Sequence, residues 1–115
     1  AVLNPAPPQN TNVYVVQLCD AISEVPRVQR LNPDADPDLD LECLYVGQTG
    51  LDPQIRFEQH MAGIRASRYV NRFGLRLNMS FLRRPNPMTE LEALREENSL
   101  AIHLRSIGHT VVGGH

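Results

Sequence analysis

Residues 89–108, TELEALREENSLAIHLRSIG, decide how this chain is expected to fold. Thr89 and Glu92 have the spacing of a capping box, and Gly108 is a typical stop, so the stretch predicts a helix that ends at about Ile107. At about 100° per residue, its apolar side chains fill one arc that would face a core. The arc contains Ala93, Leu94, Leu100, Ala101, Leu104 and Ile107.

Glu97 falls in the middle of this apolar arc. A carboxylate is costly to bury unless it is paired, hydrogen-bonded or bound to a metal. Two structural interpretations are a partly exposed glutamate beneath an imperfect stripe, and a glutamate paired with a buried arginine. We favour a third, in which Glu97 is a functional carboxylate at the mouth of a site.

Three other stretches have the composition of β-strands. Residues 12–19 (NVYVVQLC) and 43–46 (CLYV) are dense in β-branched and aromatic side chains, and residues 77–82 (LNMSFL) alternate in polarity. Residues 1–11 are rich in proline and show no periodicity, which predicts a flexible tail or linker. The remaining residues, 12–115, are expected to form one domain.

Two helices are predicted between the second and third strands. Pro53 suits the first position of a helix that runs to about residue 61 or 63. Phe57, Met61 and Ile64 have helical spacing and are expected to face the core. A second short helix, residues 67–73, is expected to end at a left-handed Gly74.

Together these elements predict an α/β (α+β) fold. We expect a small three-stranded, mostly antiparallel sheet flanked by helices, in the order β-β-α-α-β-α. Residues 20–42 contain most of the acids and three prolines, which predicts a long irregular surface insertion. The alternating acids resemble a calcium loop, but the central glycine is missing and Pro37 interrupts the run, so calcium binding is disfavoured.

Charge is divided unevenly along the chain, although the net charge is only −2. Residues 53–85 contain seven arginines and one glutamate, and the sequence has no lysine. Such a block is compatible with a solvated face and equally with a surface that binds phosphate. The residues expected to contact nucleic acid are Arg65, Arg68, Arg72 and Arg76.

Composition also disfavours several classes of protein. Cys19 and Cys43 are too few for a disulfide scaffold and lack the spacing of a zinc site. No apolar run approaches the length needed to cross a bilayer, so we expect a soluble, cytoplasmic protein that does not bind membranes.

The order of these features resembles the GIY-YIG nucleases, over about residues 12–107. The strand with Tyr14 matches the first family motif in part, and Leu44-Tyr45-Val46-Gly47 matches the second well. Residues 56–60 (RFEQH) resemble the arginine helix of the family, and residues 92–100 (EALREENSL) resemble its last helix. That pattern selects the same Glu97 that the helical arc selects.

The resemblance implies a metal-dependent endonuclease, for which we favour DNA over RNA as the substrate. Glu97 would hold Mg²⁺ or Mn²⁺, and Arg56 would neutralise charge on the phosphate. Tyr45, helped by Tyr14 or His60, would orient or deprotonate the attacking water. These five residues are therefore the expected catalytic site.

Departures from the family pattern keep two alternatives open. The first motif lacks its glycine, residues 20–42 are additional, and Gln48 stands where excision-repair members have a lysine. The asparagine that often follows the last helix is absent, which leaves its role empty or filled by His109. A catalytically inactive module that binds nucleic acid or protein is one alternative, and a toxin-type nuclease domain, suggested by the linker-like start, is the other.

Overall fold

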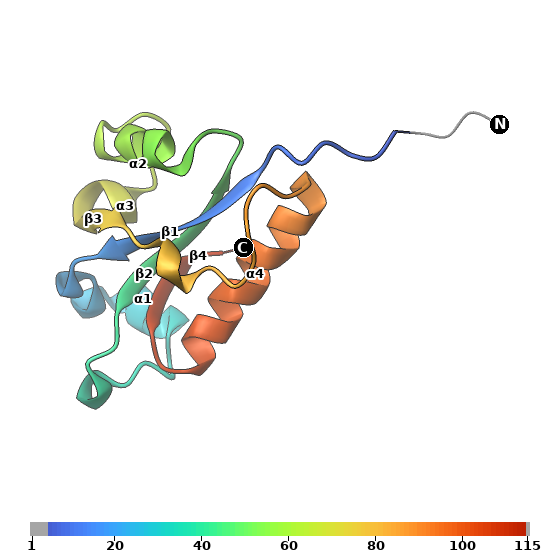
Figure 1. Ribbon diagram of the computed structural model, residues 1–115. Helices are drawn as coiled ribbons and strands as arrows, with labels where there is room; N and C mark the ends of the chain where they lie inside the picture. Colours follow the sequence, from blue (N-terminus) through green and yellow to red (C-terminus); the bar gives the residue numbers. More distant parts are fainter. Residues whose placement is uncertain (1–4, 115) are drawn as a thin grey trace.

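A four-stranded mixed sheet forms the centre of the protein, in a computed structural model that describes residues 5–114. The sheet order is β3-β1-β2-β4, with β1 antiparallel to β2 and β3, and β2 parallel to β4 (Figure 1). The strands are β1 (Asn12–Leu18), β2 (Cys43–Thr49), β3 (Gly74–Leu77) and β4 (Thr110–Gly113). The helices are α1 (Pro26–Leu31), α2 (Pro53–Met61), α3 (Arg68–Phe73) and α4 (Glu90–Ser106). The α/β class is confirmed, and the predicted number of three strands is wrong.

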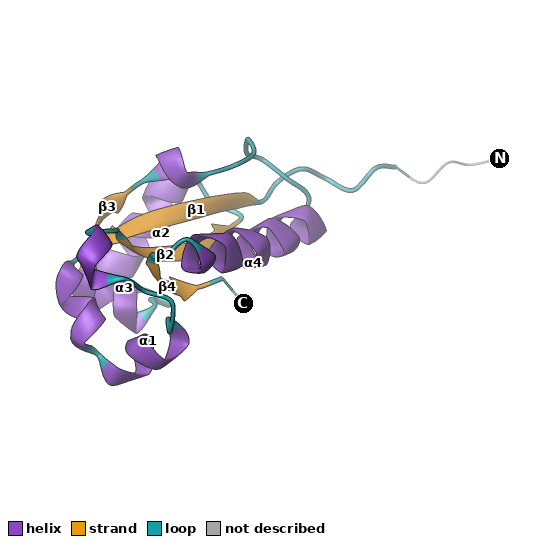
Figure 2. Cartoon of the chain, turned by 90° about the horizontal axis from the view of Figure 1, so that it is seen from below, coloured by secondary structure: helices purple, strands orange, loops and turns teal. Residues whose placement is uncertain are grey.

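The two faces of the sheet are covered by different helices. Along β1, Val13 and Val15 pack with α4, whereas Tyr14 and Val16 point to the opposite face, where Val70 of α3 lies. This alternation is the period of two that a strand imposes on its side chains. Figure 1 shows α4 on one side of the sheet with α2 and α3 on the other. Figure 2 shows α1 and α3 near one end of the sheet, while the N-terminal segment leaves from the other end.

Helix α4 follows the sequence prediction closely. Its capping box between Thr89 and Glu92 is formed in both directions, and the chain leaves the helix through Gly108 at a φ of +105°. The residues in the centre of the predicted arc are buried, but Leu94 and Ile107 at its two edges are exposed. The buried stripe is therefore narrower than the apolar arc in the sequence.

Helix α2 begins and ends where predicted, but its buried face is different. Met61 and Ile64 are exposed, so the prediction that they face the core is wrong. The residue buried on this helix is His60, and Phe57 packs partly against the same cluster. Met61 and Ile64 are exposed because α2 contacts the sheet along one narrow stripe. The imidazole of His60 is the most buried side chain of that stripe.

The region between α3 and α4 differs from the predicted strand at residues 77–82. Strand β3 ends at Leu77, and Met79–Phe81 forms a 3-10 turn. Asn78 follows β3 directly, and its amide still donates to the carbonyl oxygen of Val15, while its side chain donates to Oε1 of Gln17. Gly74 is also different from the prediction, since its backbone is extended, with φ −63° and ψ 134°, rather than left-handed.

The segment between β1 and β2 is more ordered than an irregular insertion. It contains α1, and Val28 of that helix is buried. The buried Asn32 side chain donates to the carbonyl oxygen of Val28 and exchanges hydrogen bonds with the backbone of Val111. These bonds attach the segment to the outer edge of β4. The missed strand β4 is a four-residue run, too short to give a periodic signal in the sequence.

On the N-terminal side, the fold begins at Thr11. Thr11 and Met88 exchange two backbone hydrogen bonds of 3.0 and 2.7 Å, and residues 5–10 before them form no helix or strand. The prediction for residues 1–4 lies outside the described part of the chain. None of the helices between residues 5 and 114 is long and apolar enough to cross a bilayer.

Candidate active site

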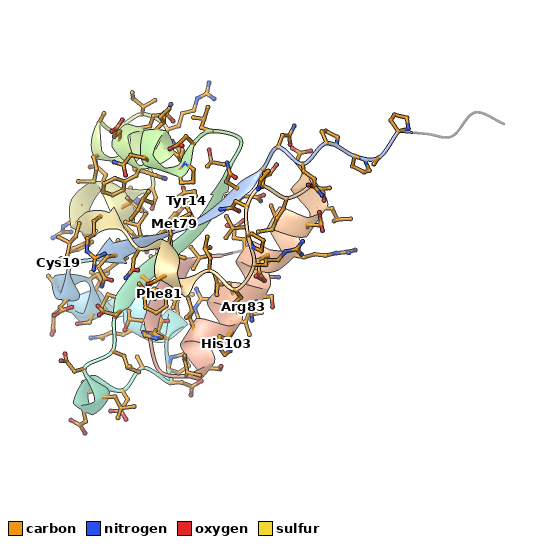
Figure 3. The ribbon with its side chains drawn as sticks, in the orientation of Figure 1. Tyr14, Cys19, Met79, Phe81, Arg83 and His103 are labelled. Carbon is orange, nitrogen blue, oxygen red and sulfur yellow. The ribbon has the colours of Figure 1, made fainter. Side chains whose placement is uncertain are left out.

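Two tyrosine rings pack over the backbone of a single glycine. Tyr14 of β1 and Tyr45 of β2 lie on the same face of the sheet, with ring centroids 6.0 Å apart. Gly47 pairs with Tyr14 across the ladder, and a Cβ atom there would lie 2.8 Å from Cζ and Oη of Tyr14 and from Cε1 of Tyr45. Figure 3 shows Tyr14 in the region between the sheet and α2. The absence of a side chain at Gly47 is therefore what allows the two rings to meet.

The opposite edge of the Tyr45 ring rests on a second glycine. Gly113, the last residue of β4, has a φ of +78°, and a Cβ atom there would lie 2.9 Å from a Tyr45 ring carbon and 2.4 Å from the carbonyl oxygen of Val46. Only glycine adopts that backbone angle without strain. Gly113 therefore lies against the Tyr45 ring, a contact that no sequence pattern indicated.

His60 completes a buried cluster with the two tyrosines. Its side chain is only 1% exposed, and its ring lies 6.0 Å from that of Tyr14 and 5.6 Å from that of Tyr45. The backbone amide of Ser67 donates to Nδ1 of His60 at 3.0 Å. In the neutral ring the proton must then be on Nε2, which donates to the Tyr14 hydroxyl at 2.7 Å.

Burial governs the protonation of the two tyrosines in this cluster. The Tyr14 oxygen accepts from His60, and the Tyr45 ring lies beside it. Burial raises the pKa of the Tyr14 phenol, and Tyr45 adds to this, while Arg56 opposes it. Burial also raises the pKa of Tyr45, where Tyr14 acts in the opposite sense. Both phenols are therefore kept in the protonated form.

We expect the buried His60 to make the protein less stable in acid. Burial, with Arg56 second, lowers the pKa of His60 from 6.5 to about 4, so the unfolded chain binds the proton more readily. The contribution of neutral His60 to the free energy of unfolding should therefore be complete above pH 6.5. It should fall by roughly 3 kcal/mol as the pH drops from 6.5 to about 4. Urea unfolding at a series of pH values measures this slope.

The matched variants for this test are His60→Gln and His103→Gln. The first should flatten the dependence between pH 6.5 and 4, and the second should retain it, because His103 is exposed on α4. Equal slopes for His60→Gln and the unchanged protein would contradict the assignment.

Arg56 lies beside the cluster and also holds the loop after α2. Its guanidinium donates to Oε1 of Gln59 and to the carbonyl oxygens of Ile64 and Arg65, at 3.1, 3.1 and 2.8 Å. Its charge acts on Tyr14, Tyr45 and His60. Arg56 forms no ion pair with any residue between 5 and 114. Its positive charge is therefore not cancelled by a carboxylate within that part of the chain.

Glu97 is buried on α4, with an exposed fraction of 5%. Burial is the main cause of the raised pKa of Tyr45, and the negative charge of Glu97 adds to it. The backbone that follows β4 passes close to α4. A Cβ atom added at Gly114 would lie 2.2 Å from Cβ of Ala101 and 3.3 Å from the Glu97 carbonyl oxygen. The structure thus brings together Tyr14, Tyr45 and His60, with Arg56 one turn before His60 on α2. Glu97 lies on α4, which covers the opposite face of the sheet.

The arginine block separates into two groups. Arg65, Arg68, Arg72 and Arg76 are exposed and form no ion pair with other residues of the described chain. Arg83 and Arg84 instead pair at 2.8 Å with Glu96 and Glu92 of α4. Figure 3 shows Arg83 beside this helix. The positive surface is therefore smaller than the sequence block suggests.

His109 does not join the cluster. It precedes β4, near the start of β2, where its Nδ1 accepts from the amide of Glu42 at 3.2 Å and its ring packs edge-on against Phe81. Ser67 is a residue that the sequence prediction missed, because its contribution is a backbone amide rather than a side chain. The only sequence signal at Ser67 is its suitability as a helix N-cap.

Within residues 5–114, no group of three or more His, Cys, Asp or Glu side chains could hold a metal ion. A single protein carboxylate matches the donor set of Mg²⁺, which usually keeps several waters and takes its remaining ligands from substrate phosphate. Comparison of the chain with known protein families, with curated proteins and with solved structures finds no match.

Proposed function

We propose that this chain is a metal-dependent endonuclease of the GIY-YIG type, which hydrolyses phosphodiester bonds, with DNA favoured over RNA. The observation that supports the proposal is the buried cluster of His60, Tyr14 and Tyr45, in which Nε2 of His60 donates to the Tyr14 hydroxyl. A guanidinium, Arg56, and a carboxylate, Glu97, both act electrostatically on Tyr45. Phosphodiester hydrolysis needs groups of these three kinds, because water must be oriented and charge on the phosphate must be neutralised.

Each residue has a distinct role in the proposed reaction. His60 holds the Tyr14 hydroxyl in place, and the Tyr14 ring packs beside Tyr45. Tyr45 orients the attacking water, and Arg56 neutralises charge on the phosphoryl oxygens. Arg56 is available for this because its present partners are neutral oxygens of its own helix and loop. The phosphate would add a charge-assisted contact to that set.

The metal implied by this proposal is Mg²⁺ or Mn²⁺, held by Glu97. When bound, such a cation stabilises the negative charge that develops on the phosphate and the leaving oxygen. The burial of Glu97 suits this task, since a carboxylate screened from water interacts more strongly with a cation. The chain itself supplies the position of the carboxylate, through α4 and its packing against β2 and β4.

The exposed arginines Arg65, Arg68, Arg72 and Arg76 are proposed to hold the nucleic-acid backbone. We expect Arg68→Gln and Arg72→Gln to weaken binding uniformly across sequences, because phosphate contacts carry no base information. Each change should also reduce the slope of log affinity against log salt by roughly 0.9. Fluorescence anisotropy with a labelled duplex at a series of salt concentrations measures both quantities.

Arg83→Gln and Arg84→Gln are the matched controls. These arginines are already paired with Glu96 and Glu92, so their removal should change the salt slope much less. If the two pairs of variants behave alike, or if affinity does not depend on salt, phosphate is not the group that this surface binds.

Incubation of the protein with supercoiled plasmid and with RNA, each in Mg²⁺ and in EDTA, tests the proposed activity. Cleavage of the plasmid in Mg²⁺ that stops in EDTA is the expected result. Faster cleavage of RNA would reverse the assignment of substrate. Salt-dependent binding without cleavage of either polymer would favour the inactive binding module instead.

A further inference from the structure

The side chain of Asn71 joins α3 to the end of α2. Its Nδ2 atom donates to the carbonyl oxygen of His60 at 3.0 Å and to that of Met61 at 3.4 Å. Carbonyl oxygens in the last turn of a helix lack helical partners, so a side-chain amide that reaches them fixes how the helix ends. Asn71 therefore ties α3 to the backbone of His60.

A second bond of this junction reaches the ring of the same histidine. The backbone amide of Ser67, the N-cap of α3, donates to Nδ1 of His60 at 3.0 Å. The backbone amide of Asn71 donates in turn to the carbonyl oxygen of Ser67 at 2.9 Å, so Ser67 and Asn71 belong to one hydrogen-bonded turn. The first turns of α3 thus hold His60 at its backbone and at its ring.

The bond to the ring decides which nitrogen of His60 carries the proton. An amide proton already occupies the lone pair of Nδ1, so the neutral ring has its own proton on Nε2. The His60 side chain is 1% exposed, so water does not replace a lost partner. A proton on Nδ1 would face the Ser67 amide, and a buried donor without an acceptor is costly. The position of Ser67 relative to the ring therefore selects the tautomer.

The tautomer of His60 in turn determines what the Tyr14 hydroxyl offers. The Nε2 proton is donated to the Tyr14 oxygen at 2.7 Å, so the phenol proton can be donated to a different group. In the other tautomer Nε2 would be an acceptor, and Tyr14 would donate to it. The phenol would then present only a lone pair to a water molecule or a phosphate oxygen.

We propose that Asn71 is a positioning residue of the candidate site, which keeps His60 in the Nε2–H tautomer by fixing α3 against the end of α2. The Tyr14 proton thereby stays available to the substrate. The inference rests on the proposed nuclease function, to which it adds a residue that acts through His60 without contact with the substrate. The tautomer itself is a property of the folded protein, so it is measured without substrate and without metal.

The ¹⁵N chemical shifts of the His60 ring test this inference in protein labelled at histidine. The spectra are recorded above pH 6.5, where the ring is neutral because burial lowers the pKa of His60 to about 4. The chain has four histidines, and the signals that disappear in His60→Gln are those of His60. We expect a protonated, pyrrole-type shift for Nε2 and an unprotonated, pyridine-type shift for Nδ1.

Asn71→Asp keeps the size of the side chain and removes the donor. Its two His60 shifts should move towards each other, because both tautomers are then populated and exchange. Asn98→Asp is the matched control, since it makes the same change on the exposed side of α4 and should leave both shifts unchanged. Asn71→Ala removes the donor without adding a charge, and it carries the same expectation if Asn71→Asp does not fold.

Ser67→Pro and Ser67→Ala test the step between α3 and the ring. Ser67 has a φ of −63°, which proline adopts, so Ser67→Pro removes the amide proton without changing that backbone angle. Ser67→Ala keeps the amide proton and removes only the hydroxyl. The two His60 shifts should converge in Ser67→Pro and stay apart in Ser67→Ala.

Plasmid nicking by the same proteins connects the tautomer to turnover. The kcat of Asn71→Asp should fall roughly 10- to 100-fold, because small displacements of a reacting group cost factors of that order. Its KM should stay close to that of the unchanged protein, since Asn71 does not contact the substrate.

Three results would overturn the inference and leave the nuclease proposal standing. They are a proton on Nδ1 of His60 in the unchanged protein, unchanged shifts in Asn71→Asp or Ser67→Pro, and an unchanged kcat in Asn71→Asp despite converged shifts. The expected shifts in an unchanged protein that does not cut DNA would instead overturn the nuclease proposal and, with it, the role of Asn71 in turnover.

Discussion

Replacement of Glu97 with glutamine is expected to lower the rate of DNA cleavage on the order of 100-fold or more. Glutamine keeps the size and one oxygen of the side chain but removes the negative charge that a hard cation requires. The proposed metal supplies several kcal/mol of transition-state stabilisation, and each 1.36 kcal/mol is about a tenfold change in rate. Nicking of supercoiled plasmid in Mg²⁺, followed over time, gives the two rates directly.

Glu96→Gln is the control for this substitution, because it makes the same chemical change one residue away. Glu96 pairs with Arg83 rather than with the tyrosine cluster, so its loss should leave turnover unchanged. DNA binding by the Glu97→Gln protein should persist, since the arginines of α3 are untouched. A Glu97→Gln protein that is folded, as judged by its urea midpoint, and still cuts at the original rate would remove Glu97 from the mechanism.

Gly47→Ala is expected to disrupt both the cluster and the fold around it. The new methyl group would occupy space 2.8 Å from both tyrosine rings, closer than real side-chain contacts allow. Tyr14 cannot move without breaking its bond to His60, so overpacking should cost about 1–3 kcal/mol of stability. Cleavage should fall with it, because Tyr14 and Tyr45 would no longer keep their relative position.

Gly50→Ala tests whether this loss is specific. Gly50 is in the turn after β2, and a Cβ atom there would have only the Asn10 carbonyl oxygen near it, at 4.0 Å. Its stability and cleavage rate should remain close to those of the unchanged protein. If Gly47→Ala is equally harmless, the two rings do not need the space that this glycine leaves.

The sequence predicted most reliably the elements that are specified by local chemistry. Helix α4 has its cap, its stop and its apolar period within residues 89–108, and all three are present in the structure. Strand β4 and helix α1 lack such signals. They are held by partners far away in the sequence, such as Asn32 on Val111, and a local pattern does not encode those contacts.

For the candidate site, the sequence selected side chains but not their arrangement. Tyr14, Tyr45, Arg56 and Glu97 could be selected from the motifs and from the apolar arc of α4. The donor to Nδ1 of His60 could not, because it is a backbone amide positioned by the loop before α3. For the same reason, the sequence did not indicate that His60 would be buried with its proton on Nε2.

The arginine-rich run at residues 53–85 predicted a positively charged surface, but it did not predict which arginines belong to that surface. Arg83 and Arg84 belong to the basic run in the sequence, but they approach α4 and pair with its acids. Pairing across distant segments is set by the fold. Net charge along a sequence window therefore overestimates the surface that remains available to a polyanion.

The parallel pairing of β4 with β2 also determines when this site can exist during synthesis. Cys43 pairs with Thr110, so the sheet edge beside Tyr45 stays open until almost the whole described chain has emerged from the ribosome. Contacts between such distant residues form late, because closing a long loop has an entropic cost. Until Gly113 packs against the Tyr45 ring, Tyr14 and Tyr45 of the nascent chain should lack the contact that β4 provides on one edge of Tyr45. The proposed catalytic activity would then appear only after folding is complete.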